Sequence, residues 1–156
     1  MKKLLTILCL VFLSSYSYSQ ETLQETIQTI VSETLNVSEG DLIEREGIFY
    51  KKFTVTPFTG NTVSFFKNGQ LKQRVTYKGG IRNGLMESFD ENGQLQLRGN
   101  YKDGEQDGLW ESYHTNGQLR SKGNVKNNKE QGLWEYFDED GNLIKTEEWK
   151  DGVLQE

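Results

Sequence analysis

The chain has 156 residues, of which 26% are charged and 34% hydrophobic, and its formal net charge at pH 7 is −5. This length allows one domain. The excess of acidic residues disfavours nucleic acid or an anionic membrane surface as a partner, because both require basic patches.

The first residues, 1–19, have the features of a secretory signal peptide. Lys2 and Lys3 give a charged start, residues 4–13 are an almost unbroken apolar run, and Ser17 and Ser19 are small residues spaced for cleavage. The apolar run is well short of the ~20 residues that a membrane-spanning helix needs. We therefore expect cleavage after Ser19, no integral membrane segment in the mature chain, and an exported protein that is periplasmic or extracellular.

The only cysteine, Cys9, lies inside this apolar run. A lipoprotein signal needs a small residue directly before its cysteine, and here Leu8 stands there. We expect Cys9 to be removed with the signal peptide, so the mature protein would have neither disulfides nor thiol chemistry. The loss of Lys2 and Lys3 moves the formal charge from −5 to about −7, which favours solubility and a basic partner.

Residues 20–40 differ in composition from the rest of the chain. Leu23, Ile27, Ile30, Val31 and Leu35 fall at helical spacing, but threonine is frequent and weakens helix propensity. This segment is predicted to be either a short amphipathic helix or a flexible linker, and Gly40 would end a helix there.

The remaining residues, 41–156, contain a repeat with a step of 24 residues. The tetrapeptide NGQL begins at Asn68, Asn92 and Asn116, and DGNL begins at Asp140. Such strict self-similarity indicates a repeat architecture. We predict repeats over 68–91, 92–115 and 116–139, a C-terminal partial repeat over 140–156, and a degenerate cap over 41–67, because terminal repeats are often atypical.

Each repeat contains two extended segments. In the first, residues 71–78, Leu71, Val75 and Tyr77 share one face and charged residues share the other, which is the period of a strand. Asn-Gly or Asp-Gly pairs separate the repeats, and glycine-bracketed turns such as GIRNG separate the two segments. We predict an all-β fold of about nine strands, in which hairpin repeats form an elongated, twisted antiparallel meander.

The second extended segment leaves one question open. Strict alternation over LWESYH places Leu109, Glu111 and Tyr113 on one face and Trp110 on the other. Either Trp110 covers the second face of the sheet, or a β-bulge breaks the alternation.

The pattern Asn-Gly-x-Leu, Tyr-Lys-x-Gly and Gly-Leu-Trp-Glu-x-Tyr resembles the variant MORN repeat, and bacterial proteins with this pattern resemble the YwqK-like antitoxin family. The resemblance covers residues 41–156. One copy has Met86 in place of Trp, and another has Val125 and Asn128 in place of Tyr and Gly. The MORN resemblance implies stacked hairpins with protein or lipid contacts, and the antitoxin resemblance implies that the protein binds and neutralises a protein toxin.

The residues do not suggest an enzyme. His114 is the only histidine, and Asp90 and Asp138 occupy its position in neighbouring repeats, so we interpret it as an interchangeable turn residue. A His/Cys metal site has no ligands available, there is no Gly-x-Ser-x-Gly elbow, and no motif predicts a cofactor.

The aromatic residues are the remaining candidates for function. They are either core residues that supply burial to a thin sheet, or a recognition surface. We predict a protein partner, with contacts to Trp110, Tyr113, Trp134 and Phe137, and no nucleic acid; the oligomeric state does not follow from the sequence. The expected function is an exported, non-enzymatic protein-interaction module, including antitoxin- or immunity-like toxin binding. The alternative is an envelope-associated structural or glycan-binding protein.

Overall fold

The computed structural model describes residues 36–156, so the predicted signal peptide, Cys9 and residues 20–35 lie outside the described residues. Residues 36–41 form strand β1 (Asn36–Ser38) and the short 3-10 helix η1 (Glu39–Asp41). This part of the predicted helical or linker segment is therefore ordered by the sheet, because β1 pairs in parallel with β4 and the Val37 side chain is buried. No helix within residues 36–156 has the length and apolar character needed to cross a membrane.

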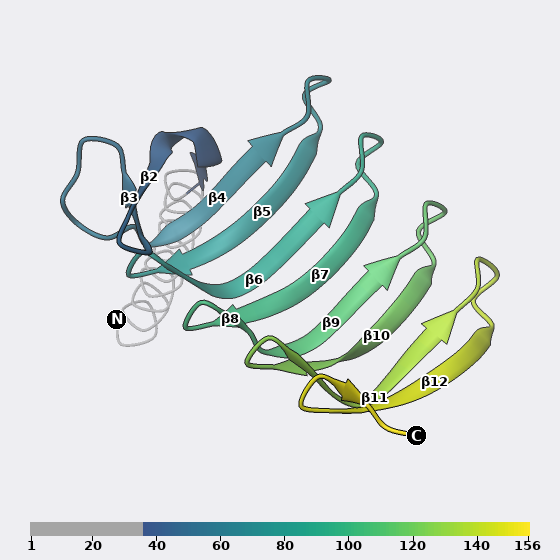
Figure 1. The fold of residues 1–156 in the computed structure, drawn as a ribbon. Helices are drawn as coiled ribbons and strands as arrows, with labels where there is room; N and C mark the ends of the chain where they lie inside the picture. The colour runs from purple at the N-terminus through teal and green to yellow at the C-terminus, as the bar shows by residue number, and fades with distance from the viewer. Residues whose placement is uncertain (1–35) are drawn as a thin grey trace, which may run out of the picture. The chain divides into compact units, whose positions relative to one another are not determined.

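Most of the described chain forms one eleven-stranded sheet in which neighbouring strands run antiparallel, apart from the β1–β4 pair (Figure 1). Its strand order is β1-β4-β5-β6-β7-β9-β10-β11-β12-β13, and β8 pairs with β7. The strands are β4 (Gly60–Phe65), β5 (Leu71–Lys78), β6 (Ile81–Phe89), β7 (Leu95–Lys102), β8 (Glu105–Gln106), β9 (Gly108–Tyr113), β10 (Leu119–Lys126), β11 (Lys129–Phe137), β12 (Leu143–Lys150) and β13 (Val153–Leu154). The all-β hairpin meander predicted from the 24-residue step is confirmed, with more strands than the nine expected.

A separate hairpin, β2 (Leu42–Arg45) and β3 (Ile48–Lys51), packs against the N-terminal part of the sheet. The backbone of Phe49 donates to the Gly80 carbonyl at 2.9 Å, and its ring meets the Tyr77 ring edge-on at 5.3 Å. The buried cluster of the described residues begins here and continues along the sheet as Val37, Phe58, Val75, Tyr77, Met86, Trp110 and Val125.

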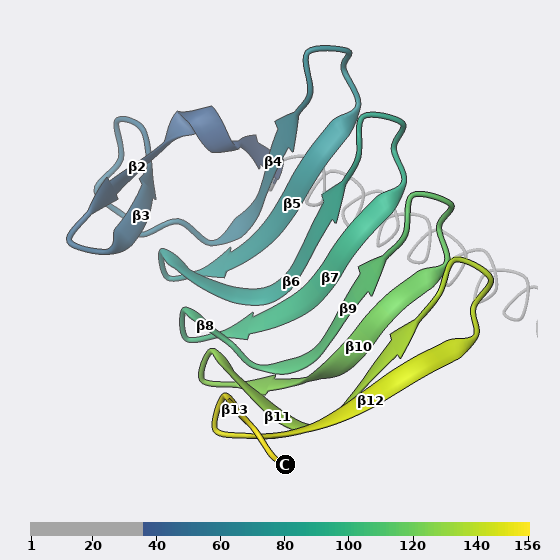
Figure 2. The same cartoon turned by 45° about the vertical axis from the view of Figure 1, so that its right-hand side comes forward.

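Two kinds of turn lie at opposite ends of the strands (Figure 2). The Asn-Gly and Asp-Gly turns between repeats, such as 66–70, close with a hydrogen bond from the Phe66 N–H to the Gln70 carbonyl. Only their glycines have positive φ, for example 87° at Gly69. This combination is a type I turn followed by a left-handed glycine, which suits a three-residue hairpin loop.

The turns within repeats differ from the glycine-bracketed turns that we predicted. Lys78 pairs with Ile81, so the loop is only Gly79-Gly80, and both residues have positive φ. Asp103-Gly104, Asn127-Asn128 and Asp151-Gly152 have the same geometry, which is that of a type I′ turn. The second glycine of the predicted bracket, Gly84, lies inside β6 beside a register shift, because its φ of 119° and its close approach to Thr76 suit a bulge.

The alternation of side chains gives the sheet two different faces, and Trp110 follows it. The face that we call the tryptophan face carries the row Val75, Met86, Gly99, Trp110, Gly123 and Trp134. Its register pairs are Val75–Met86, Met86–Gly99 and Trp110–Gly123, and close approach of the ring to the glycine joins Gly99 to Trp110 and Gly123 to Trp134. Trp110 and Ser112 are buried on this face. Of the two readings open from the sequence, the one in which Trp110 covers the second face is therefore the observed one.

Each tryptophan of this row lies flat on a glycine of the preceding strand. A Cβ atom added to Gly99 would lie 2.3 Å from the Trp110 ring, and one added to Gly123 would lie 2.1 Å from the Trp134 ring. Neither glycine has positive φ, so both are required for space. In the first repeat the pair is Val75 and Met86, where a smaller ring-free side chain leaves room for a Cβ.

The opposite face, which we call the ladder face, carries a row of alternating charges: Arg74, Glu87, Arg98, Glu111, Lys122 and Glu135. Glu87 is 7% exposed and forms ion pairs with Arg74 at 3.5 Å and Arg98 at 3.0 Å. Lys122 and Glu135 pair at 2.9 Å. Opposite charges on adjacent strands stabilise the strand pairing, so this row supports the sheet along its length.

Candidate binding site on the tryptophan face

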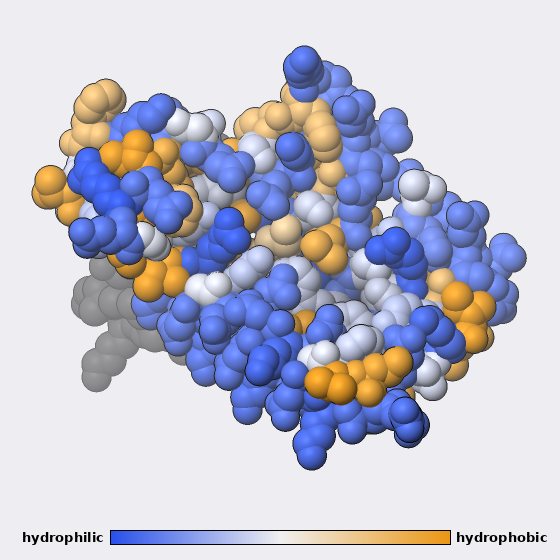
Figure 3. All heavy atoms as spheres, in the orientation of Figure 1, coloured by the Kyte–Doolittle hydropathy of each residue, from blue (hydrophilic) through white to orange (hydrophobic). Residues whose placement is uncertain are grey.

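Two adjoining hollows lie on the tryptophan face across the middle repeats. The larger has a volume of about 460 Å³ and is lined mainly by polar residues, and the smaller has a volume of about 110 Å³ and contains both middle tryptophans. They share Leu97 and Ser112. Pale colours, which mark intermediate hydropathy, predominate in the centre of the view in Figure 3.

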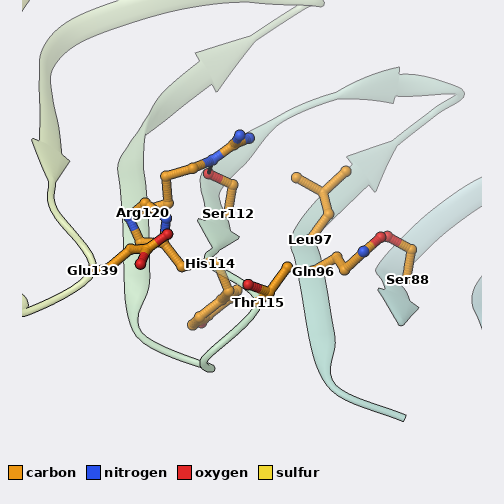
Figure 4. Close-up of a pocket in the computed structure, with 9 residues that line it drawn as sticks. Ser88, Gln96, Leu97, Ser112, His114, Thr115, Arg120 and Glu139 are labelled. Carbon is orange, nitrogen blue, oxygen red and sulfur yellow. Dashed lines mark hydrogen bonds between the residues drawn. The ribbon is translucent and has the colours of Figure 1, made fainter. Parts of the chain in front are cut away.

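The polar hollow is built around Arg120, which extends from β10 (Figure 4). Its Nε donates to the Ser112 hydroxyl at 3.2 Å, and that hydroxyl lies 2.6 Å from the Ser121 hydroxyl. Ser112 is only 6% exposed, so the bond to Nε is anchored in the sheet. The register pairs Ser112 with Ser121 on β10 and with Leu97 on β7, which fixes the floor of the hollow.

Turns between repeats form one end of the polar hollow. His114 and Thr115 come from the turn after β9, and Glu139 comes from the turn after β11. The His114 Nε2 atom lies 2.9 Å from the Phe137 carbonyl oxygen, to which it donates in the Nε2–H tautomer. The Asn116 side chain also donates to the Glu139 carbonyl at 2.7 Å. These two bonds hold the neighbouring turns together at the rim.

His114 is placed as the sequence suggests, at the position of a turn residue, but its contacts differ from those of its counterparts. The Asp90 carboxylate accepts the N–H groups of Asn92 and Gln94 within its own turn. In the His114 turn, the Asn116 side chain accepts the Gln118 N–H instead, which leaves the imidazole to reach the next turn.

The smaller hollow is apolar at its floor. Trp110 is 6% exposed and Trp134 is partly buried, and Val125 and Leu97 complete the apolar part of the lining. The rest of the lining is polar: Gln106, Glu111, Ser112, Ser121 and Glu130. The Tyr101 ring meets Trp110 edge-on at 5.6 Å. Among residues 36–156, the buried indole Nε1 atoms of Trp110 and Trp134 have no hydrogen-bond partner, which costs free energy that the ring packing must offset.

A family model described as the MORN repeat variant matches residues 58–78, 82–103, 106–127 and 130–151, which together make up more than half of the chain. The chain belongs to the MORN repeat variant family. Searches of curated proteins and of solved structures found no significant match. Each matched MORN repeat contains two strands joined by an Asn-Gly-type turn, as in β6 and β7, so its boundaries are shifted by about half a unit from the repeats that we set at 68–91, 92–115 and 116–139.

The MORN sheet divides the four predicted binding residues between its two faces. Trp110 and Trp134 line the smaller hollow on the tryptophan face. The Tyr113 hydroxyl donates to the Glu111 carboxylate at 3.1 Å, and the Lys122 Nζ atom lies 5.8 Å from the centre of the Phe137 ring. Glu111 and Lys122 belong to the ladder face, so the Tyr113 hydroxyl and the Phe137 ring lie on that side. Tyr113 also lines the polar hollow, between its chain neighbours Ser112 and His114.

Electrostatics differ between the two faces of the MORN sheet. On the ladder face, the hydrogen bond to Glu87 raises the pKa of Arg98, and burial together with the Glu111 carboxylate raises the pKa of Tyr113. None of the ion pairs among residues 36–156 includes Arg120 on the tryptophan face. Five of the six ladder charges are therefore ion-paired within the sheet, and the sixth, Glu111, accepts the Tyr113 hydroxyl, whereas Arg120 hydrogen-bonds to a neutral serine.

Sequence reasoning missed Arg120, Ser112, Ser88 and Leu97 as site residues. These residues lie on four different strands, β10, β9, β6 and β7, so no short sequence motif contains them all. One signal was present in the sequence: the turn beginning at His114 reads HTNG, whereas its neighbours DENG and DEDG are acidic. The HTNG turn therefore brings fewer negative charges to the polar hollow than a DENG or DEDG turn would bring at the same place.

The hydroxyl and imidazole groups of the hollow contact other polar groups of the sheet. Within residues 36–156, no group of three or more His, Cys, Asp or Glu side chains is placed to hold a metal ion. The Ser112 hydroxyl contacts Arg120 and Ser121, and the imidazole of His114 contacts a carbonyl oxygen. In this arrangement the serine has no base beside it that could activate it as a nucleophile.

Proposed function

We propose that the protein is an exported, non-enzymatic interaction module whose tryptophan face binds an extended segment of a partner protein. MORN repeats indicate a repeat protein with a binding role. A protein toxin is a partner of this kind, as the resemblance to the YwqK-like antitoxin family implies. The observation that carries the proposal is the pair of adjoining hollows on one face of the middle repeats, one mainly polar and one that combines tryptophan rings with polar side chains.

The geometry of the hollows supports an extended partner. The larger hollow falls within the volume range of ordinary ligand sites, and it continues through Leu97 and Ser112 into the apolar one. A chain that lies across the strands would place polar groups in the first and an apolar side chain in the second. Buried aromatic side chains are frequent centres of binding energy, and Trp134 is the partly exposed one here.

Export is the part of the proposal that rests on residues 1–19. The charged start, the apolar run and the small residues before Gln20 support cleavage after Ser19. N-terminal sequencing of the natural protein tests this, and the expected first residue is Gln20 or a close neighbour. An intact Met1 on protein recovered from the cytoplasm would contradict export.

The binding proposal is tested by filling the polar hollow. Gln96 is exposed at a register shift and lines the hollow, so a Gln96→Trp substitution should block it without disturbing the core. Lys72 occupies the same position one repeat earlier and is also exposed, which makes Lys72→Trp the matched control. Each variant is used as bait for the envelope fraction of the natural source, and captured proteins are identified by mass spectrometry.

We expect the wild type and Lys72→Trp to capture a common protein that Gln96→Trp does not capture. A protein captured equally by all three would place the contact elsewhere. Retention of all three on isolated cell wall, with no protein captured, would favour the alternative role as an envelope-associated or glycan-binding protein.

A further inference from the structure

Arg120 differs from the other arginines of the repeat sheet in its partners. Arg74 and Arg98 form ion pairs with Glu87 on the ladder face. The Arg82 guanidinium lies 3.5 Å from the Tyr77 hydroxyl and 5.5 Å from the centre of the Tyr101 ring. Within residues 36–156, the Arg120 side chain makes one hydrogen bond, from Nε to the neutral Ser112 hydroxyl, and it lines a hollow.

The anchoring bond prepares the guanidinium for a ligand. Because the hydrogen bond to Ser112 takes only the Nε–H group, it fixes the direction of the guanidinium and leaves the N–H groups of the two Nη atoms for a ligand. A planar guanidinium presents parallel N–H groups that match the two oxygens of a carboxylate. An arginine that is already held in place loses less conformational freedom when it binds.

Further donors line the same hollow. Ser88 and Thr115 carry hydroxyls and Gln96 carries an amide, and they come from β6, the turn after β9, and β7, respectively, all on one side of Arg120 (Figure 4). Leu97 provides an apolar side and connects the polar hollow with the one that contains Trp134. These groups suit a ligand that joins a charged oxygen group to an apolar side chain.

The charge balance favours a carboxylate over a phosphate. Glu139 lines the hollow with Arg120 and would repel an anion, more strongly for a doubly charged one. The whole chain is acidic, with a formal charge of −5. A single arginine beside one glutamate can accommodate one negative charge, and the Glu139 carboxylate can in turn accept an N–H from the same ligand.

We propose that the polar hollow is a carboxylate-binding subsite, in which Arg120 binds a carboxylate of the partner while an apolar neighbour of that carboxylate enters the Leu97–Trp134 hollow. The inference rests on the proposed binding role of the tryptophan face. The carboxylate comes either from the C-terminus of a protein or from an acidic side chain, and both present the same two oxygens.

The test uses purified mature protein and small probes, so it does not need the natural partner. N-acetyl-leucine carries a main-chain carboxylate beside an apolar side chain, and the α-amide of N-acetyl-glutamate carries a side-chain carboxylate. N-acetyl-leucinamide lacks the charge, and inorganic phosphate is the competing anion. Binding is followed by NMR through the ring signals of His114, which is the only histidine and lines the hollow.

We expect at least one carboxylate probe to shift the His114 signals in a saturable manner, with N-acetyl-leucinamide and phosphate binding at least about tenfold more weakly. Arg120→Gln should weaken carboxylate binding about tenfold or more, and Glu139→Gln should strengthen it because a repulsive charge is removed. Arg98→Gln, on the ladder face, is the matched control and should bind as the wild type does. Thermal unfolding of each variant shows whether the fold is intact.

The stronger of the two carboxylate probes identifies the source of the carboxylate. The inference is overturned if neither carboxylate probe binds, if phosphate binds as tightly, or if Arg120→Gln binds as the wild type does. Carboxylate binding without capture of any protein partner would leave the subsite in place and refute the proposed interaction role. If wild type and Arg120→Gln capture the same protein partner, the proposed interaction role stands and the carboxylate-binding subsite is refuted.

Discussion

The contact between glycine and tryptophan can be tested by adding one methyl group. In Gly99→Ala the new Cβ would lie 2.3 Å from the Trp110 ring atoms, far inside the closest approach of two carbon atoms. The backbone of Gly99 has no positive φ, so alanine meets no conformational penalty there. Any loss of stability therefore reports the clash with the ring alone.

The magnitude follows from the cost of overfilling a packed site. Inserting a methyl group that forces a side chain to move costs about 1–3 kcal/mol. Trp110 is 6% exposed and Tyr101 packs against its ring, so it cannot simply rotate into solvent. We expect Gly99→Ala to lower the free energy of unfolding by about 2 kcal/mol, equivalent to roughly 8 °C in Tm.

The assay is equilibrium urea unfolding of the mature protein, followed by tryptophan fluorescence. Gly40→Ala is the matched control, because its new Cβ would meet only Ser38 Oγ at 3.7 Å and Gly40 also has no positive φ. The double variant Gly99→Val with Trp110→Met copies the natural pair Val75 and Met86. Its loss should be smaller than the sum of the single losses by about 1 kcal/mol or more.

Two results would refute this reasoning. A Gly99→Ala protein as stable as Gly40→Ala would show that the Trp110 ring does not lie on Gly99. Additive losses in the double variant would show that the two positions do not share one space, and the Val75–Met86 pair would then have no bearing on the Gly–Trp pairs.

Three further predictions concern the charged and turn residues. Glu87→Ala should lower the free energy of unfolding by about 1–2 kcal/mol, because it leaves two arginines without their buried partner. Glu135→Ala removes a carboxylate that is more exposed and has a single partner, so it should lower the free energy of unfolding by about 0.5 kcal/mol. Equal losses of the two variants in urea unfolding would contradict this ranking. His114→Asp should change the free energy of unfolding by less than about 1 kcal/mol. The variant loses the hydrogen bond to the Phe137 carbonyl, but the new aspartate can accept the N–H groups of its own turn as Asp90 does. A larger loss would show that the His114–Phe137 hydrogen bond contributes more than the bonds within the turn. Hydrogen bonds from Asn142 lower the pKa of Asp138. The stability that the Asp138 carboxylate contributes is therefore present above about pH 4 and is lost as the pH falls through the lowered pKa. Asp138→Asn should flatten the dependence of Tm on pH below about pH 4, and an unchanged dependence would argue against this contribution.

Much of the fold was determined by the sequence alone. The 24-residue step and the alternation within Leu71–Lys78 predicted the hairpin meander, because a repeated strand pattern with one apolar face can bury that face only by pairing with its own copies. The Asn-Gly pairs marked turns correctly, since a glycine there can adopt the left-handed conformation that the loop needs. These features are local, so they can be recognised from adjacent residues.

The positions of the site residues were decided by tertiary structure. Trp110 and Tyr113 are three residues apart, and where each side chain lies depends on the alternation that holds between them. The structure places the Trp110 ring in the smaller hollow and the Tyr113 hydroxyl against Glu111 of the ladder face. The polar hollow joins Ser88, Arg120 and Glu139 through the pairing of β6, β7, β9, β10 and β11, with register shifts between them. The register and the bulges are set by contacts between whole strands, such as the packing of a tryptophan ring on a glycine. The local sequence therefore does not specify which residues of different strands will lie side by side.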